Sequence, residues 1–328
     1  MKSKPAHSHG WLVGVVGIAA GVSLMVLVPK LSAVAGTLVL VALFHLVGAA
    51  IALGSMVTLA PGVFTRFAAR RRALAPDTQG YDFGWSFGAV YGPWIAALAS
   101  FALALALQLQ FPALWPAWFV VALFGVSSVV GGVLLRATRT LDHAPLPLVD
   151  LFAGDDDLVL DAGCGGGRTT LAVARVLPRG RIVSLDRFDA GYIEGGGRAL
   201  IERNLRIAGL TERVQVQAGD MTRTLFPDAH FDSAVSAHAI DHLGDQKMAG
   251  LAEIFRVLKP GGRFLVVAWV PGWVTFTLAN VFCLLLASPA DWRKMAAAVG
   301  FTLREEGSFN GFWFAVLERP QGHDISPA

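Results

Sequence analysis

The chain has 328 residues, of which 54% are hydrophobic and 16% charged, with a net charge of +3. This composition excludes an ordinary soluble protein of that length. Residues 1–135 carry a charge of +5 and the remainder −2, so the basic excess lies in short loops beside anionic lipid, and no nucleic-acid partner is expected. Two cysteines, Cys164 and Cys283, are too few for a disulfide framework or a cysteine-rich zinc site.

Four apolar stretches are predicted to span a membrane, because a bilayer core of about 30 Å needs roughly 20 apolar helical residues. They are Trp11–Pro29, Ser32–Ala60, Gly88–Gln110 and Ala113–Leu135. Basic residues collect on the cytoplasmic side of short loops, and here they all fall on one side except Lys30. We therefore expect an integral protein of a bacterial inner membrane, with its N-terminus and everything after the last span in the cytoplasm. Any one span taken alone could instead be a buried core helix.

After residue 139 the pattern changes to short apolar runs that alternate with amphipathic stretches. Strand, helix, strand repeated in this way predicts a parallel sheet with right-handed crossovers, and ligands bind beyond the carboxyl ends of such strands. The expected strands are 158–161, 181–186, 213–220, 231–237 and 263–270, with helices over 169–176, 199–208 and 246–257 and a final hairpin from 301–306 and 312–319.

The run VLDAGCGGG, residues 159–167, ends the first of these strands. Its glycines allow a sharp turn and let a ligand approach bare backbone, while Thr169 opens the next helix with its N–H groups pointing outward. A dinucleotide-binding loop, Gly-x-Gly-x-x-Gly, would need a third glycine at position 168, which is arginine. The pattern here is Asp-x-Gly-x-Gly-x-Gly.

From Asp150 to Arg319 the sequence resembles the class I methyltransferases that use S-adenosylmethionine, in their ubiquinone and menaquinone (type 11) branch. The resemblance is carried by VLDAGCGGG, by Asp186 at the end of VSLD, by Asp220-Met221 after AGD, and by EIFRVLKPGGRFLVV. It implies an α/β Rossmann-like domain with a mostly parallel seven-stranded sheet, in which a reversed seventh strand lies beside the fifth. The expected domains are a membrane domain over 1–140, the methyltransferase domain over 141–319 and a disordered tail over 320–328.

The resemblance also implies a cofactor, S-adenosyl-L-methionine, and the residues that bind it. These are Asp161, Gly163, Gly165, Gly167, Asp186, Arg187, Asp220 and Met221. Asp161 would orient the loop and the ammonium of the methionine moiety, and Asp186 would accept hydrogen bonds from both ribose hydroxyls, as a carboxylate about 20 residues past the loop can. Asp220 and Met221 would contact the adenine. Asp161 could instead cap a helix, Asp186 could be a surface acid, and Met221 could belong to the core.

Three interpretations fit the run SAHAIDHL after the fourth strand. His238 and His242, four residues apart, are predicted to share one helical face. One of them could be a general base with Asp241 orienting its imidazole. They could bind a metal, although the run lacks the glutamate of His-Glu-x-x-His and a third ligand, so no metal site is predicted. The favoured interpretation is a polar cluster that closes the cofactor pocket.

Two further segments are candidates for contacts with the acceptor. Residues 187–199, RFDAGYIEGGGRA, could form a mobile lid that carries Tyr192 or Glu194, or a plain loop. Residues 269–290 carry no charge. They could lie against a bilayer, admit an apolar acceptor, or form a buried helix.

The sequence as a whole predicts an integral membrane methyltransferase whose partners are the bilayer and a lipophilic small molecule: a quinone or phenol, a phospholipid amine, or an isoprenoid. A membrane-anchored methyltransferase of a soluble small molecule is one alternative. A non-catalytic cofactor-sensing domain that regulates a membrane partner is another. The number of subunits is left open.

Overall fold

The computed structural model describes residues 10–28, 31, 34–36, 39, 80–85, 87–137, 144, 146–147, 151–189, 193, 197–309 and 311–321. Contacts divide the chain into two units. The helical unit comprises Met1–Thr78, Ser86–Leu135 and Phe276–Phe282, and the sheet unit comprises Gln79–Trp85, Arg136–Thr275 and Cys283–Ala328. The division differs from the expected boundary near residue 140 in two places, since Gln79–Trp85 joins the sheet unit and Phe276–Phe282 joins the helical unit.

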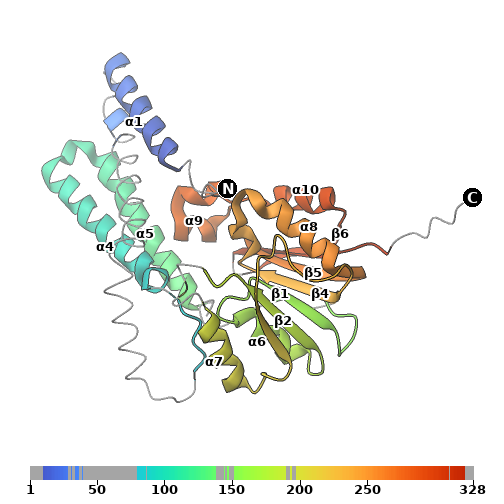
Figure 1. Ribbon diagram of the computed structural model, residues 1–328. Coiled ribbons are helices and arrows are strands. Elements are labelled where there is room, and N and C mark those ends of the chain that lie inside the picture. Colours follow the sequence, from blue (N-terminus) through green and yellow to red (C-terminus); the bar gives the residue numbers. More distant parts are fainter. Residues whose placement is uncertain are drawn as a thin grey trace, which may run out of the picture. The chain divides into compact units, whose positions relative to one another are not determined.

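The helical unit contains an apolar hairpin formed by α4, the short 3-10 helix η3 and α5 (Figure 1). Small residues let the two long helices pack closely. A Cβ at Gly125 would lie 2.9 Å from the ring of Phe101, and one at Gly132 would lie 2.9 Å from Trp94. The described helices of this unit are α1 (Gly10–Leu27), α4 (Phe87–Gln110), η3 (Pro112–Leu114) and α5 (Trp115–Ala137).

Two described helices, Val90–Gln110 and Pro112–Ala137, are long and apolar enough to cross a membrane, and they match the third and fourth predicted spans. The first predicted span corresponds to α1, in which Val15–Leu24 is a shorter apolar helix. The second predicted span, Ser32–Ala60, lies almost wholly outside the described residues. Four spans are therefore not confirmed. The bent pair Trp273–Ala279 and Cys283–Val299 could add one more.

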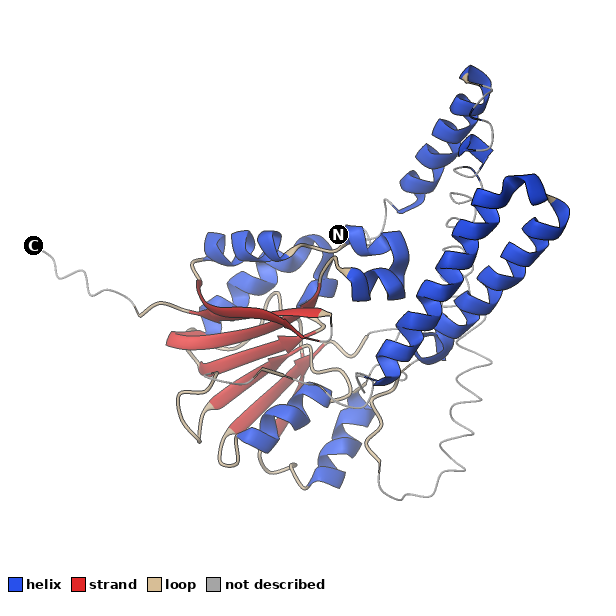
Figure 2. Ribbon diagram, turned by 180° about the vertical axis from the view of Figure 1, so that it is seen from behind, coloured by secondary structure: helices blue, strands red, loops and turns tan. Residues whose placement is uncertain are grey.

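The sheet unit is built on one seven-stranded sheet with the order β3-β2-β1-β4-β5-β7-β6. The first five strands are parallel, and β7 runs antiparallel between β5 and β6. This confirms the Rossmann-like sheet with a reversed strand beside the fifth. Figure 2 shows the strands of this sheet in red, with helices on both sides. The strands are β1 (Leu158–Ala162), β2 (Arg181–Asp186), β3 (Val214–Ala218), β4 (Phe231–Ala237), β5 (Leu258–Trp269), β6 (Thr302–Phe309) and β7 (Phe312–Glu318).

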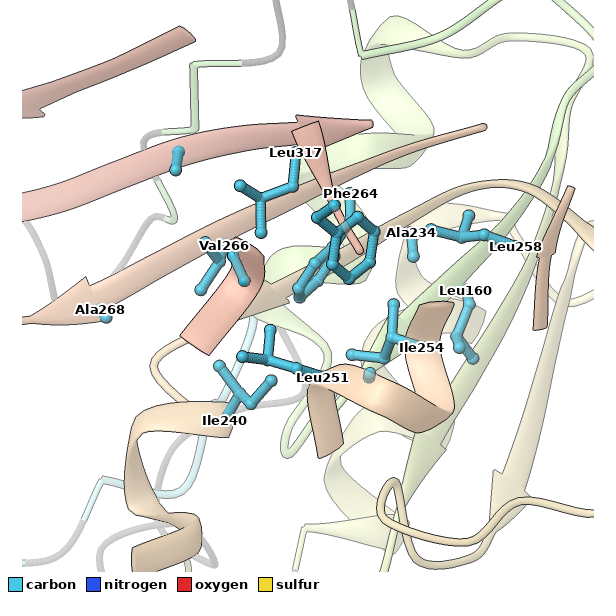
Figure 3. Packing of buried hydrophobic residues seen from close by; sticks show 14 of the residues in the cluster. Leu160, Ala234, Ile240, Leu251, Ile254, Leu258, Phe264, Val266, Ala268 and Leu317 are labelled. Carbon is cyan, nitrogen blue, oxygen red and sulfur yellow. The ribbon is translucent and has the colours of Figure 1, made fainter. Parts of the chain in front are cut away.

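Helices cover both faces of the sheet because alternate strand residues point to opposite sides. In β1, Val159 packs in a cluster with α6 and α7, whereas Leu160 packs with α8 and α10. Figure 3 shows the cluster that contains Leu160, in which Phe264 and Val266 of β5 face Leu251 of α8. The helices are α6 (Arg168–Val176), α7 (Arg198–Ala208), η5 (Ile240–Gln246), α8 (Lys247–Val257), α9 (Trp273–Ala279), η6 (Asn280–Leu285) and α10 (Pro289–Val299).

Helix α10 was not predicted, although its start carries a clear sequence signal. Ser288 accepts the N–H of Asp291, and the Asp291 carboxylate accepts the N–H of Ser288, which together form a capping box. Pro289 occupies the first helical position, where a proline costs no hydrogen bond. Ser288 and Pro289 lie at the end of the uncharged run 269–290, which the prediction treated as one apolar segment, and Asp291 directly follows it.

Candidate functional site

The glycine loop, residues 163–167, turns from β1 into α6 through left-handed backbone that favours glycine. Gly163, Gly165 and Gly167 have φ angles of 86°, 50° and 88°. The N–H groups of Gly163 and Cys164 donate to the carbonyl of Leu185 at 2.7 and 3.1 Å, so the loop is fixed to the end of β2. A Cβ at Gly163 would lie 2.2 Å from Cβ of Ala239. The tight packing therefore requires glycine there.

Asp186 ends β2 beside this loop. Its Oδ2 accepts the backbone N–H of Gly165 at 2.9 Å, and its Oδ1 accepts that of Phe188 at 2.8 Å. Each carboxylate oxygen can accept a second hydrogen bond. Asp186 can thus hold the loop and still receive two hydroxyl groups from a ligand at the carboxyl edge of the sheet.

Asp161 lies buried at the end of β1 with one oxygen free of hydrogen-bond partners. Thr170 Oγ1 donates to its Oδ2 at 2.6 Å and lies 2.9 Å from the hydroxyl oxygen of Ser184. Among the described residues, Oδ1 has no hydrogen-bond partner. Burial raises the pKa of Asp161 to about 7, with a smaller contribution from the charge of Asp186. The N-cap position of α6 is Gly167, which makes no side-chain cap bond. The Asp161 carboxylate also accepts a hydrogen bond from the backbone of Thr170, in the first turn of this helix.

The residues predicted to contact adenine follow β3 at the same edge. The Oδ1 of Asp220 accepts the N–H and the hydroxyl of Thr222, each at 2.8 Å. Met221 Cε lies 2.8 Å from the position that a Cβ at Gly163 would take, which places this side chain against the loop. Arg187 Nη1 lies 4.0 Å from Asp220 Oδ2. The structure thus gathers the predicted cofactor residues around the ends of three neighbouring strands.

His238 follows β4 in an unusual backbone conformation, with a φ of 56°. Helix η5 begins only at Ile240, so the prediction that His238 and His242 share one helical face is wrong. The imidazole packs against Phe312 and Trp269, with ring centroids 4.4 and 5.7 Å away. Its buried Nδ1 has no partner among the described residues. Burial, followed by the charges of Arg168 and His242, lowers the pKa of His238 to about 3.

Asp241 connects η5 to the end of β5. Its Oδ2 accepts the backbone N–H of Trp269 at 3.0 Å, and burial raises the pKa of its carboxyl group. The backbone N–H of His242 donates to the carbonyl of Ala239 at 3.0 Å. In the described part of the chain, no three His, Cys, Asp or Glu side chains lie close enough to hold a metal ion.

The predicted lid is described only in part. Ile193 forms an antiparallel bridge with Trp85, whereas Tyr192 and Glu194 lie outside the described residues. The same holds for residues 322–328 of the predicted tail.

The sequence analysis did not predict a role for three residues at this edge, Asn204, Arg168 and Trp85. Asn204 is fully buried, and the signal for it is a polar side chain on the apolar face of α7, next to Leu205 and Ile201. Arg168 follows the loop, and burial lowers its pKa to about 10. Its guanidinium carbon lies 5.0 Å from the centre of the Trp85 ring, and no local sequence signal predicts that pairing.

This arrangement fits the expected cofactor. The free Oδ1 of Asp161 can accept a hydrogen bond from an ammonium group, and Asp186 can accept the two hydroxyls of a ribose. Gly163 of the glycine loop is only partly buried, and the loop precedes the N-terminus of α6. Asp220 and Met221, the residues predicted to contact the adenine, lie at the same edge, and Arg187 lies beside Asp220.

Comparison with known proteins agrees with this assignment. Residues 159–262 match the family model described as a methyltransferase domain. A probable S-adenosylmethionine-dependent methyltransferase of Mycolicibacterium smegmatis is 32% identical over 182 residues, which is 54% of this chain and 63% of that protein. A sterol 24-C-methyltransferase of Eremothecium gossypii is 38% identical over 115 residues, 35% of this chain and 28% of that protein.

A demethylmenaquinone methyltransferase of Symbiobacterium thermophilum is 34% identical over 110 residues, 33% of this chain and 41% of that protein. The chain thus spans less than two thirds of the length of each of these three relatives. The residues matched by the family model, 159–262, lie in the sheet unit.

Proposed function

We propose, for a chain that carries a class I S-adenosylmethionine-dependent methyltransferase domain, that the whole protein is an integral membrane enzyme which methylates a small lipophilic acceptor. The acceptor is a quinone or phenol, a phospholipid amine, or an isoprenoid. Two relatives are named for demethylmenaquinone and for a sterol, both of which are lipophilic. The apolar helices α4 and α5 support placement in a membrane.

The observation that carries this proposal is the course of the chain after β5. Helix α9 begins in the sheet unit, where Thr275 donates to the carbonyl of Val270 at 2.7 Å. Its later residues belong to the helical unit, and a Cβ at Gly131 of α5 would lie 2.6 Å from the carbonyl oxygen of Thr277. One short helix therefore carries the chain from the sheet unit into the helical unit. A methyltransferase domain whose chain continues directly into apolar helices is suited to an acceptor that resides in the lipid phase.

S-adenosylmethionine held at this site would supply the methyl group of its sulfonium centre to the acceptor by in-line displacement, and the electron pair of the broken carbon–sulfur bond would leave with sulfur as a thioether. The protein's own part is to align the two reactants and to exclude water. Asp161 holds the amino end of the cofactor, Asp186 holds the ribose, and Asp220 and Met221 hold the adenine. The glycines of the loop let its backbone approach the cofactor closely while these four side chains contact it.

His238 is the acceptor-side residue in this proposal. A group with a pKa near 3 is uncharged at neutral pH and is a weak base, so proton removal is not its main task. Its free Nδ1 and the aromatic rings of Trp269 and Phe312 suit a flat or apolar acceptor that carries one polar atom. If that atom bears a proton, the proton passes to solvent or to a second group.

A transfer assay with cofactor labelled in its methyl group tests the proposed function. The protein in detergent is mixed with membrane lipid extract, and the organic and aqueous phases are counted separately. Label in the lipid phase is expected. Label in a soluble metabolite would instead indicate an anchored enzyme for a soluble acceptor, and cofactor binding without transfer to any acceptor would indicate a sensing domain.

A further inference from the structure

A six-residue segment, Gly80–Trp85, lies across the glycine loop although it precedes α4 in the chain and is more than seventy positions away from that loop in sequence. We call this segment the strap. It belongs to the sheet unit, whereas α4, which begins at Phe87, belongs to the helical unit. The helical hairpin α4–α5 is therefore inserted into the chain of the sheet unit rather than appended in front of it.

Asn204 of α7 connects the strap to the glycine loop. Its Oδ1 accepts the backbone N–H of Asp82 at 3.0 Å, and its Nδ2 donates to the carbonyl of Asp82 at 2.7 Å. The same Nδ2 donates to the carbonyl of Gly166 at 2.9 Å. Asn204 is fully buried. Because one amide satisfies three backbone groups, removing it would leave all three without this partner.

The strap also contacts the loop directly. A Cβ at Gly166 would lie 3.1 Å from both Cα and the carbonyl oxygen of Phe83, so the two backbones touch. Within the strap, Asp82 Oδ1 accepts the N–H of Gly84 at 2.9 Å. This local turn leads to Trp85, where the strap ends.

Trp85 has two partners at the site. It pairs with Ile193 through an antiparallel bridge, and Ile193 Cδ1 lies 3.0 Å from the position of a Cβ at Gly165. The guanidinium of Arg168 lies over the Trp85 ring at 5.0 Å, a distance at which a cation–π contact is favourable. Through these partners the strap reaches both the middle of the loop and the first residue of α6.

We infer that the strap is a part of the cofactor site, and that Asn204 and Trp85 are positioning residues which hold the glycine loop in its binding conformation. The inference rests on the proposed use of this loop for S-adenosylmethionine. A loop with left-handed residues is held only if its surroundings fix it. Asn204 fixes it from α7 through the Gly166 carbonyl, and Trp85 fixes it through Ile193 and Arg168. Without the strap the Gly166 carbonyl and the start of α6 at Arg168 would lose these contacts, and affinity for the cofactor would fall.

Calorimetric titration of the full-length protein in detergent with S-adenosylhomocysteine, the demethylated product, tests this role. Asn204→Leu removes the three hydrogen bonds while keeping the volume of the side chain, and we expect Kd to rise about tenfold or more. Arg206→Gln changes an exposed residue of the same helix and should leave Kd within about twofold. The thermal midpoint of the unliganded protein is recorded for each variant, since a purely structural residue would change the midpoint without changing Kd.

A second pair of variants decides the matter if Asn204→Leu does not fold. Trp85→Ala is expected to raise Kd about tenfold, and Trp85→Phe, which keeps an aromatic ring over Arg168, should recover most of that loss. Wild-type affinity in both Asn204→Leu and Trp85→Ala would overturn the inference, as would a wild-type protein that does not bind S-adenosylhomocysteine. Weakened binding in these variants, together with a wild-type protein that binds but transfers no methyl group, would support the strap and contradict the proposed function.

Discussion

Asp186 accepts the backbone N–H of Gly165 at 2.9 Å, so the acid that ends β2 is hydrogen-bonded to the middle of the glycine loop that follows β1. This bond couples the two parts of the site that the ribose and the methionine moiety of the cofactor would contact. A change at Asp186 therefore acts on the loop as well as on the ligand.

Asp186→Ala should weaken the binding of S-adenosylhomocysteine about 100-fold. Hydrogen bonds to a charged group contribute about 1.5–3 kcal/mol each, and about 1.4 kcal/mol is a factor of ten in affinity. Titration calorimetry on the detergent-solubilised protein measures this change. Asp155→Asn is a matched control, because Asp155 is an exposed acid that pairs with Arg179 and is not among the predicted cofactor residues. Equal affinity of Asp186→Ala and wild type would remove Asp186 from the binding site.

Asp161 should make the unliganded fold less stable as the pH rises. Its pKa is about 7 in the folded protein against 3.8 ordinarily, so the folded state holds a proton between these values that the unfolded state releases. Stability is thus lost from about pH 4 to pH 7. Asp161→Asn carries no such charge. The difference in the free energy of unfolding between Asp161→Asn and wild type should shift in favour of the variant by about 3 kcal/mol between pH 5 and pH 8, at about 1.4 kcal/mol per pKa unit. Thermal midpoints of both proteins at the two pH values check this, and a constant difference would contradict it.

The same carboxyl group should set the pH dependence of cofactor binding. An ammonium ligand needs the ionised form of Asp161, and a group with a pKa of about 7 is mostly protonated at pH 6. Affinity of the wild type for S-adenosylhomocysteine should therefore increase from pH 6 to pH 8. Asp161→Asn should bind weakly with no such increase. A wild-type Kd that does not change over this range would show that Asp161 does not meet the ammonium group.

Gly163→Ala should abolish cofactor binding, whereas Gly209→Ala should not. Both glycines have positive φ angles, 86° and 68°, so both alanines bear a backbone cost of about 1–2 kcal/mol. A Cβ at Gly163 would in addition lie 2.2 Å from Ala239, while a Cβ at Gly209 would meet nothing within 4 Å. Comparable affinities in the two variants would mean that the loop can move away from Ala239 at little cost.

His238→Asn should lower turnover without changing the affinity for the cofactor. Asparagine tolerates the left-handed backbone that His238 adopts, so the fold should persist while the ring contacts with Phe312 and Trp269 are lost. With a pKa of about 3, His238 does not change charge between pH 5 and pH 8, and the pH profiles of variant and wild type should run parallel. A step near pH 6.5 present only in the wild type would instead identify His238 as a general base.

A pair of truncations tests where the catalytic unit begins. Removal of residues 1–78 keeps the strap, whereas removal of residues 1–140 deletes it. The shorter deletion should bind S-adenosylhomocysteine like the full chain, and the longer one should bind about tenfold more weakly or not fold. Equal binding by a folded 141–328 chain would place the whole cofactor site after residue 140.

The sequence was sufficient to predict the features that depend on local pattern. Alternating apolar runs predicted the five parallel strands and the final hairpin. The resemblance to class I methyltransferases, together with a distance of about 20 residues from the loop, indicated Asp186. The spacing of the glycines identified the loop without any tertiary information. The bond between Asn204 and Asp82 joins residues 122 positions apart, and no local pattern reports such a contact.

His238 shows the other limit of sequence reasoning. A spacing of four predicts a shared helical face only if the helix already includes both residues. Here the N–H of His238 donates to the carbonyl of Val267 at the end of β5, and that tertiary bond accompanies a left-handed residue just before η5 begins. The helical unit shows a similar limit, because the apolar stretch after β5 joins the hairpin α4–α5 through Gly131. Hydropathy alone gives the length of a span and not its neighbours.

The most direct test of the account is mass spectrometry of lipids from cells that express the wild-type chain, the Asp186→Ala variant or neither. A lipid that carries one additional methyl group is expected in the first cells only, with both proteins present in the membrane fraction in equal amounts. A lipid profile that is the same in all three, or a methylated lipid that persists with Asp186→Ala, would contradict it.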